Sequence, residues 1–123
     1  MNDGNVTIAE AYYKALKEKN SAKMGKYLDP NVQYITPLAN MAGKKVALTA
    51  AEKVFPLLDT ITIRTKFESE TQAMIVFDMA FLPPIGTISI AALLTIHNKL
   101  ITKIEMFYDS RRLMAKKDEI FSQ

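Results

Sequence analysis

The second half of the chain constrains the fold most, because four segments rich in β-branched and aromatic residues follow one another there. They span residues 60–68, 71–82, 87–96 and 100–108, and each has the composition of a β-strand. Only the turn residues 69–70, 83–86 and 97–99 separate them. Connections this short join antiparallel neighbours. We therefore predict a run of four antiparallel strands.

The first segment of the chain has the hydrophobic spacing of a helix. Apolar residues recur at helical intervals across residues 7–20, which predicts a helix with one buried face. Thr7 or Asn5 is expected to cap its start, since both side chains can accept hydrogen bonds from free backbone amides. Ser21 is expected to cap a second, shorter helix.

A short strand and a further helix are predicted between these segments and the four strands. Residues 32–36 are extended in character, and Pro37 stops them. Helical spacing returns at Gly43 and continues to Phe55, where Pro56 should end or kink the helix because it lacks a backbone donor. Helices, a strand, a helix and then four strands in this order predict the α+β class.

The length of 123 residues fits one domain, with a core at about residues 7–109 and a charged C-terminal tail at residues 110–123. Hydrophobic residues make up 49% of the chain and charged residues 24%, which is an ordinary globular composition. Within the tail, we expect solvated side chains at Arg111, Arg112, Lys116 and Lys117, and a last helix is one interpretation of the segment.

Charge and hydropathy exclude several classes of partner. The 16 basic residues are interspersed with 13 acidic ones, so we expect no nucleic-acid surface. No apolar run approaches the roughly 20 residues that span a bilayer, and no signal peptide is visible. The chain contains no cysteine and a single histidine, and no metal or other cofactor is expected. These features favour a cytoplasmic protein.

Two of the predicted strands are apolar on both faces. Residues 74–82 and 88–94 carry few polar side chains on either side. One face must cover the helices, while the other would be costly to leave in water. We therefore predict a homodimer that forms through the outer face of the sheet.

The order of several short segments resembles the SnoaL-like branch of the nuclear-transport-factor-2-like superfamily, over roughly residues 8–109. The segments that carry this resemblance are Ala11–Leu16, Tyr27–Val32, Pro37, the helix led by Gly43, Lys99–Ile104 and Phe107–Asp109. The resemblance implies a cone-shaped, cystatin-like α+β roll, in which a curved antiparallel sheet wraps the first helix around a ligand pocket. It also implies homodimers. Relatives include ketosteroid isomerase, polyketide cyclases and limonene epoxide hydrolase, so the fold alone does not specify a reaction.

The positions at which such relatives keep their catalytic groups hold other residues here. Thr36 stands where ketosteroid isomerase has its carboxylate base, and Leu93 where it has a carboxyl donor. Met106 and Ala92 stand where polyketide cyclases have their carboxylate and histidine. A shift of one residue would exchange Met106 for Glu105 or Phe107 and reverse the face. We therefore expect neither of these two reactions.

Asp78 is the acidic residue within the apolar strand at residues 74–81. It shares one face with Val76, while bulkier residues occupy the other face, and this division predicts that Asp78 points into the cavity. Burial there would raise its pKa and make it a candidate catalytic acid or base. Alternatively, Asp78 pairs with Arg64 or Lys66, or lies at a dimer surface.

The cavity is predicted to be apolar with few polar groups. The residues expected to contact a ligand are Tyr12, Tyr34, Thr36, Val76, Ile90, Leu94 and Met106. We expect a protein that binds a small apolar, oxygen-bearing molecule with weak or no catalysis. The alternatives are an isomerase, cyclase or epoxide hydrolase that uses Asp78, and a non-catalytic dimerisation or accessory domain.

Overall fold

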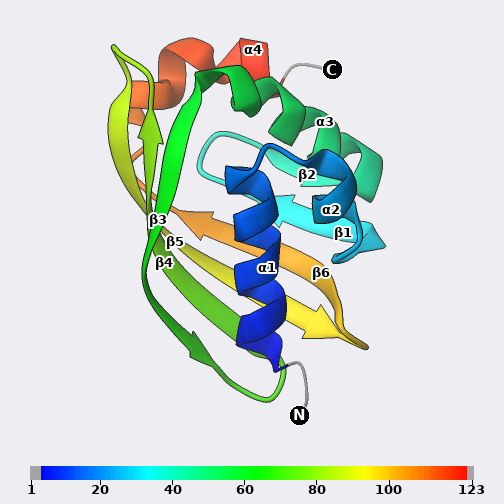
Figure 1. The fold of residues 1–123 in the computed structure, drawn as a ribbon. Coiled ribbons are helices and arrows are strands. Elements are labelled where there is room, and N and C mark those ends of the chain that lie inside the picture. Colours follow the sequence, from blue (N-terminus) through cyan, green and yellow to red (C-terminus); the bar gives the residue numbers. More distant parts are fainter. Residues whose placement is uncertain (1–3, 122–123) are drawn as a thin grey trace.

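The computed structural model describes residues 4–121 and confirms the α+β class (Figure 1). No helix in this range is long and apolar enough to cross a membrane. The elements, in chain order, are α1 (Asn5–Lys17), α2 (Ser21–Gly25), β1 (Leu28–Ile35), β2 (Asn40–Ala42), α3 (Lys44–Val54), the 3₁₀-helix η1 (Phe55–Leu57), β3 (Leu58–Glu68), β4 (Gln72–Phe81), β5 (Gly86–His97), β6 (Leu100–Phe107), the 3₁₀-helix η2 (Arg111–Lys116) and α4 (Lys117–Phe121).

The strands form one sheet in the order β2-β1-β6-β5-β4-β3. The predicted antiparallel pairing of the four late strands is confirmed, because β3, β4, β5 and β6 each pair antiparallel with the next. In contrast to a wholly antiparallel sheet, β1 pairs parallel with β6. The three-residue strand β2, which was not predicted, pairs with β1 and forms one edge of the sheet.

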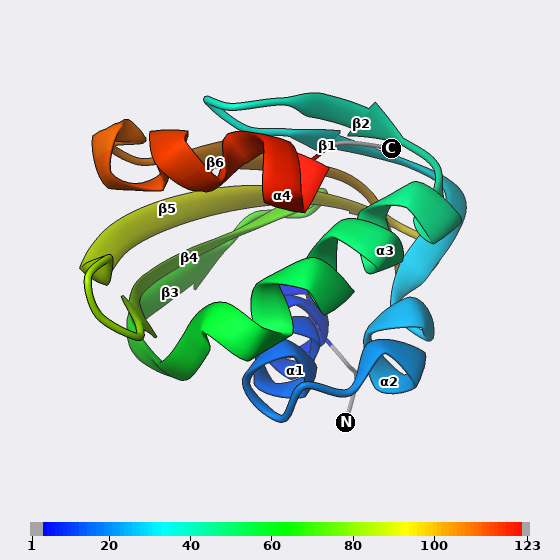
Figure 2. The same ribbon diagram turned by 90° about the horizontal axis from the view of Figure 1, so that it is seen from above.

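Helix α1 lies against the concave face of the sheet (Figures 1 and 2). The ring of Tyr13 packs on that of Phe77 with 4.5 Å between centroids. Lys66 of β3 donates to both carboxylate oxygens of Glu10 at 2.9 Å. At the start of the helix, the Asn5 side chain donates to the backbone of the β3–β4 turn at 3.0 Å. These contacts fix α1 across the sheet.

The predicted caps differ from those observed. Gly4 is the N-cap of α1, without a side-chain hydrogen bond, because Asn5 is used in the contact with the β3–β4 turn. Asn20, not Ser21, caps α2 by accepting from the Lys23 amide at 3.0 Å. Gly43 precedes α3 with φ 101°, a left-handed region in which a side chain would strain the backbone.

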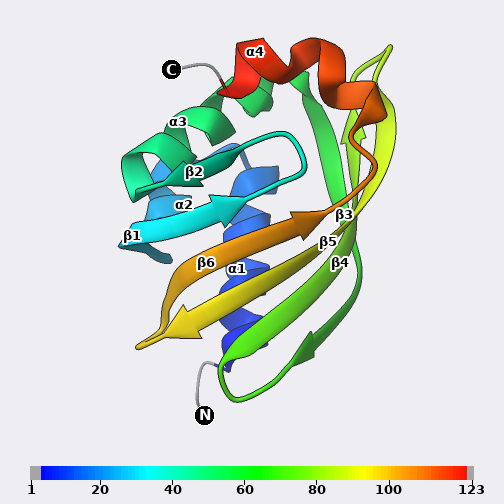
Figure 3. The same ribbon diagram turned by 180° about the vertical axis from the view of Figure 1, so that it is seen from behind.

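The two faces of the sheet differ in cover. On β4, Ala73, Ile75, Phe77, Met79 and Phe81 are buried on the concave face, and the residues between them lie on the outer face. No described helix covers the outer face (Figure 3). This face carries two cross-strand sets of apolar side chains, which we call the outer apolar rows: Phe67–Met74–Leu93 and Val76–Ala91–Phe107. Phe67 and Phe107 are 64% and 55% exposed.

The C-terminal segment lies across the open end of the cone, against α3 (Figure 2). The basic residues Arg111, Arg112 and Lys117 are exposed as expected, and α4 is the last helix. Leu113 and Ile120, by contrast, are only 5% and 3% exposed. Arg112 binds the backbone near the start of β5, since it donates to the carbonyl oxygens of Ile85 at 3.1 Å and Thr87 at 2.8 Å. The segment is therefore part of the fold.

Candidate functional site

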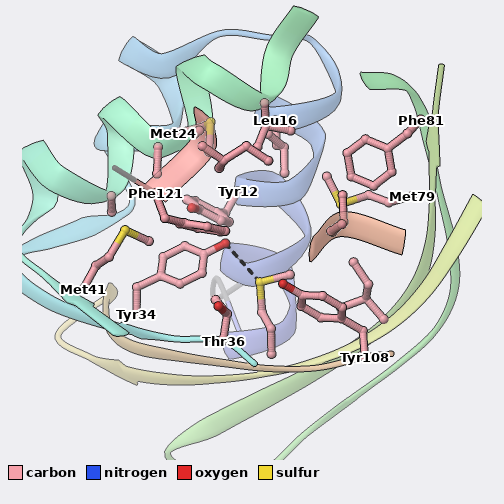
Figure 4. Close-up of a pocket in the computed structure, with 18 residues that line it drawn as sticks. Tyr12, Leu16, Met24, Tyr34, Thr36, Met41, Met79, Phe81, Tyr108 and Phe121 are labelled. Carbon is pink, nitrogen blue, oxygen red and sulfur yellow. Dashed lines mark hydrogen bonds between the residues drawn. The ribbon is translucent and has the colours of Figure 1, made fainter. Parts of the chain in front are cut away.

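A cavity of about 60 Å³ lies inside the cone. Its walls are almost entirely apolar and come from α1, α3, the concave face of the sheet and the C-terminal segment (Figure 4). Residues predicted to contact a ligand that line it are Tyr12, Tyr34, Thr36, Ile90 and Met106. Ligand sites usually measure about 300–1,000 Å³, so the cone is nearly filled.

Asp78 lies outside this cavity, so the prediction that it points inward is wrong. Its carboxylate is on the outer face, where it accepts from the Ser89 hydroxyl at 2.7 Å and lies 3.7 Å from an Arg64 guanidinium nitrogen. Val76, on the same face, is also outside the cavity. The cause is packing: the face that meets α1 needs the bulkier side chains to fill the core, which leaves the smaller ones outside.

The strand faces also decide whether Leu94 and Met106, two further predicted ligand contacts, face the cavity. Leu94 is fully buried on the concave face but packs within the core, away from the cavity. Met106 faces the cavity, whereas Glu105 lies on the outer face opposite Leu93 and near Lys103 at 3.8 Å. Met106, not Glu105, is therefore the residue that faces the cavity, and no carboxylate side chain from residues 4–121 lines it.

The polar groups of the cavity are hydroxyls. Tyr34 donates to the Met106 thioether sulfur at 3.0 Å, and thioethers are weak acceptors. Tyr34 and Tyr108 point toward one another from either side of that sulfur (Figure 4). The Tyr12 hydroxyl makes no hydrogen bond with any residue in the described range. The hydrogen-bonding capacity of Tyr12 and Tyr34 is thus largely unused.

Thr36 lines the cavity, but its hydroxyl serves the backbone. It donates to the Ala39 carbonyl at 3.0 Å and accepts from the amides of Leu38 at 3.1 Å and Ala39 at 3.0 Å. These contacts hold the turn between β1 and β2, and they leave Thr36 no free donor for a ligand.

Tyr13, next to Tyr12 on α1, has a buried hydroxyl without a hydrogen-bond partner among the described residues. Its ring meets that of Tyr12 edge-on at 5.1 Å. Burial raises the pKa of Tyr12 and of Tyr13 well above the usual value, and the nearby Tyr34 raises both further. Burial also raises the pKa of Tyr34. All three phenols are therefore neutral at physiological pH.

These pKa shifts predict unfolding in alkali. A group whose pKa is raised in the folded state holds its proton more tightly there, so its stabilising effect is complete below the unfolded pKa of about 10 and is lost as pH rises. We expect the free energy of unfolding to fall above that pH by about 1.4 kcal/mol per pH unit for each of Tyr12, Tyr13 and Tyr34. Circular dichroism and the phenolate absorbance of these three tyrosines should change in one step. Ionisation of more than two of the five tyrosines without loss of structure would contradict this.

Several cavity residues were not predicted. Those from α3 and the C-terminal segment are Ala47, Ala50, Ala51, Val54, Leu113, Ile120 and Phe121. The helical spacing of the α3 residues was visible in the sequence, but the face they would meet was not. In the tail, Leu113 and Ile120 are seven positions apart, a helical interval that the many charges around it obscured.

Within residues 4–121, no group of three or more carboxylate or imidazole side chains is arranged to hold a metal ion. The cavity can enclose the apolar part of a small molecule and offer phenol hydroxyls as hydrogen-bond donors to a polar atom on it.

No protein-family model and no curated protein matches the sequence. Solved structures match closely in shape. A nuclear-transport-factor-2-like protein of unknown function from Cytophaga hutchinsonii superposes with a TM-score of 0.81 at 18% identity, covering 92% of this chain and 96% of that one. A protein with a cystatin-like fold from Silicibacter pomeroyi gives 0.80 at 12% identity, covering 95% and 84%.

A further neighbour, from Catenulispora acidiphila, has a ketosteroid isomerase-like fold and was crystallised in complex with trimethylamine. It superposes with a TM-score of 0.73 at 18% identity, covering 89% of this chain and 91% of that one. Identities this low establish the fold and nothing finer. The chain therefore has the nuclear-transport-factor-2-like fold that its sequence resembles.

Proposed function

We propose that this chain, which has the nuclear-transport-factor-2-like fold, binds a small, neutral, largely apolar molecule that carries a hydrogen-bond-accepting oxygen. The observation that carries the proposal is the pair of cavity phenols, Tyr12 without a partner and Tyr34 with only a thioether acceptor. A buried donor that lacks a good acceptor costs stability. A ligand oxygen would satisfy it.

The composition of the cavity favours binding over catalysis. Among the residues that the structure describes, no carboxylate, histidine or lysine lines it, so a proton-transfer step would depend on phenols whose raised pKa keeps them protonated. A general acid or base works best with a pKa near the operating pH. The neighbour with trimethylamine supports a ligand of a few heavy atoms for a cavity of about 60 Å³.

A second candidate is a non-catalytic dimerisation or accessory domain. The small cavity and the outer apolar rows favour it. The rows place Met74, Leu93 and Val76 side by side on a face that lacks a helix cover. Apolar patches of this kind mark interaction sites, and we propose a homodimer through this face under either candidate.

The test of ligand binding compares two small probes, cyclohexanone and toluene, by ligand-observed NMR titration. Cyclohexanone accepts a hydrogen bond and toluene does not. We expect Tyr12→Phe and Tyr34→Phe each to weaken cyclohexanone binding by roughly two- to tenfold, the value of one hydrogen bond. Toluene binding should be unchanged. If neither probe binds the wild type, the cavity is packed core and the second candidate is favoured.

A further inference from the structure

We infer that α4 is a removable wall of the proposed ligand site, and that ligands enter by displacing it from α3. This inference rests on the proposed binding function, which it deepens by naming the entrance and the size of ligand admitted. It predicts a site much larger than the closed cavity.

The first argument is that α4 separates two spaces. Ile120 and Phe121 line the inner cavity of about 60 Å³ and also an outer groove of about 290 Å³ along α3. Met41 and Ala50 line both spaces as well. The side chains of α4 thus form the partition together with Met41 and Ala50. When α4 moves away, its part of the partition opens and the two spaces join into one whose size falls within the range of ligand sites, about 300–1,000 Å³.

The second argument is that the C-terminal segment is attached unevenly. Its first part is fixed by Leu113, which is buried, and by Arg112, which donates to the carbonyl oxygens of Ile85 in the β4–β5 connection and Thr87 in β5. Gly86 permits this contact, since a Cβ there would lie 3.1 Å from the guanidinium. The Arg112 contacts therefore anchor η2 to the sheet.

The second part of the segment has weaker support. Helix α4 comprises only five residues, too few to be stable as an isolated helix. Lys117, Asp118 and Glu119 are exposed, so they keep their hydration when the helix moves. Its buried surface is supplied by Ile120 and Phe121, which pack toward α3. We therefore place the hinge after η2, so that α4 swings while η2 stays in place.

Cysteine labelling tests this movement without a ligand, since the chain has no cysteine of its own. Ile120→Cys and Leu113→Cys are a matched pair, as the two residues are 3% and 5% exposed. Leu94→Cys, at a fully buried core position, reports global unfolding. We expect a thiol reagent to label position 120 at least about tenfold faster than position 113, because local opening exposes only the former. Equal rates at positions 120 and 113 would overturn the inference.

Ligand entry is tested with a neutral naphthyl ketone dye, which is too large for the closed cavity. We expect Phe121→Ala to speed association of the dye by about fivefold or more, because it raises the population of the open form. Met114→Ala is the control, since Met114 lies on the same segment but is 53% exposed. An unchanged rate in Phe121→Ala would also overturn the inference.

The two proposals fail in different ways. Fast labelling at position 120 with no binding of ketone probes leaves the removable wall intact and rejects the binding function. Probe binding that is insensitive to Phe121→Ala, together with equal labelling rates, rejects the wall and leaves the binding function.

Discussion

Leu93→Arg is expected to convert the protein from a dimer to a monomer at micromolar concentration. Leu93 lies at the centre of the outer face, between Met74 and Glu105 of the neighbouring strands. In a dimer through this face, the substitution would bury an unpaired guanidinium in place of an apolar contact. Such a change costs several kcal/mol, which corresponds to a dissociation constant raised about 100-fold or more. Native mass spectrometry measures the change directly.

Glu52→Arg supplies the control for this experiment. Glu52 is exposed on α3, away from the outer face, and the variant gains the same side chain. It should remain dimeric. A wild-type protein that is monomeric throughout the micromolar range would reject the homodimer, and a dimer that survives Leu93→Arg would place the interface elsewhere.

Tyr13 should give stability changes of opposite sign with two substitutions. Tyr13→Ala removes a ring that is 1% exposed and stacked on Phe77, so we expect a loss of about 3–5 kcal/mol in the free energy of unfolding. Tyr13→Phe keeps the ring and removes only the hydroxyl, which has no partner among the described residues. Since an unsatisfied buried polar group is destabilising, we expect a gain of about 1 kcal/mol.

Denaturant titration of the two variants and the wild type measures both effects. Tyr27→Phe is a suitable control, because Tyr27 is only partly buried and packs at the edge of the core. The free energy of unfolding should change less in Tyr27→Phe than in either Tyr13 variant. A loss of stability in Tyr13→Phe would mean that the hydroxyl is satisfied in solution.

The sequence was sufficient for the elements and their pairing in the second half of the chain. Short turns such as His97–Lys99 leave adjacent strands no choice but antiparallel pairing. The position of β1 could not be predicted in this way, because β1 pairs with β6, which lies far from it in the chain. Local spacing carries no information about such a pair.

The faces of the strands were the main source of error in the site. Strict alternation on β4 was visible, but alternation alone does not say which set faces inward. Asp78 was assigned to the cavity because small residues accompany it, whereas the core needed the large rings, as the stacking of Tyr13 on Phe77 shows. By contrast, Tyr12 and Met106, which were placed from the family resemblance, and Tyr34, which shares a strand face with Thr36, do line the cavity.

The position of β6 inside the sheet has a consequence for the order of events during synthesis. The sequence neighbours β3, β4 and β5 can pair as soon as they are made, whereas β1 pairs only with β2 and β6. Helix α1 can pack on β3 and β4 once they are made, whereas β1 must wait for nearly the whole chain before the sheet links it to the rest. Long-range pairs of this kind slow folding. A nascent chain that stops before residue 100 therefore cannot close the cone.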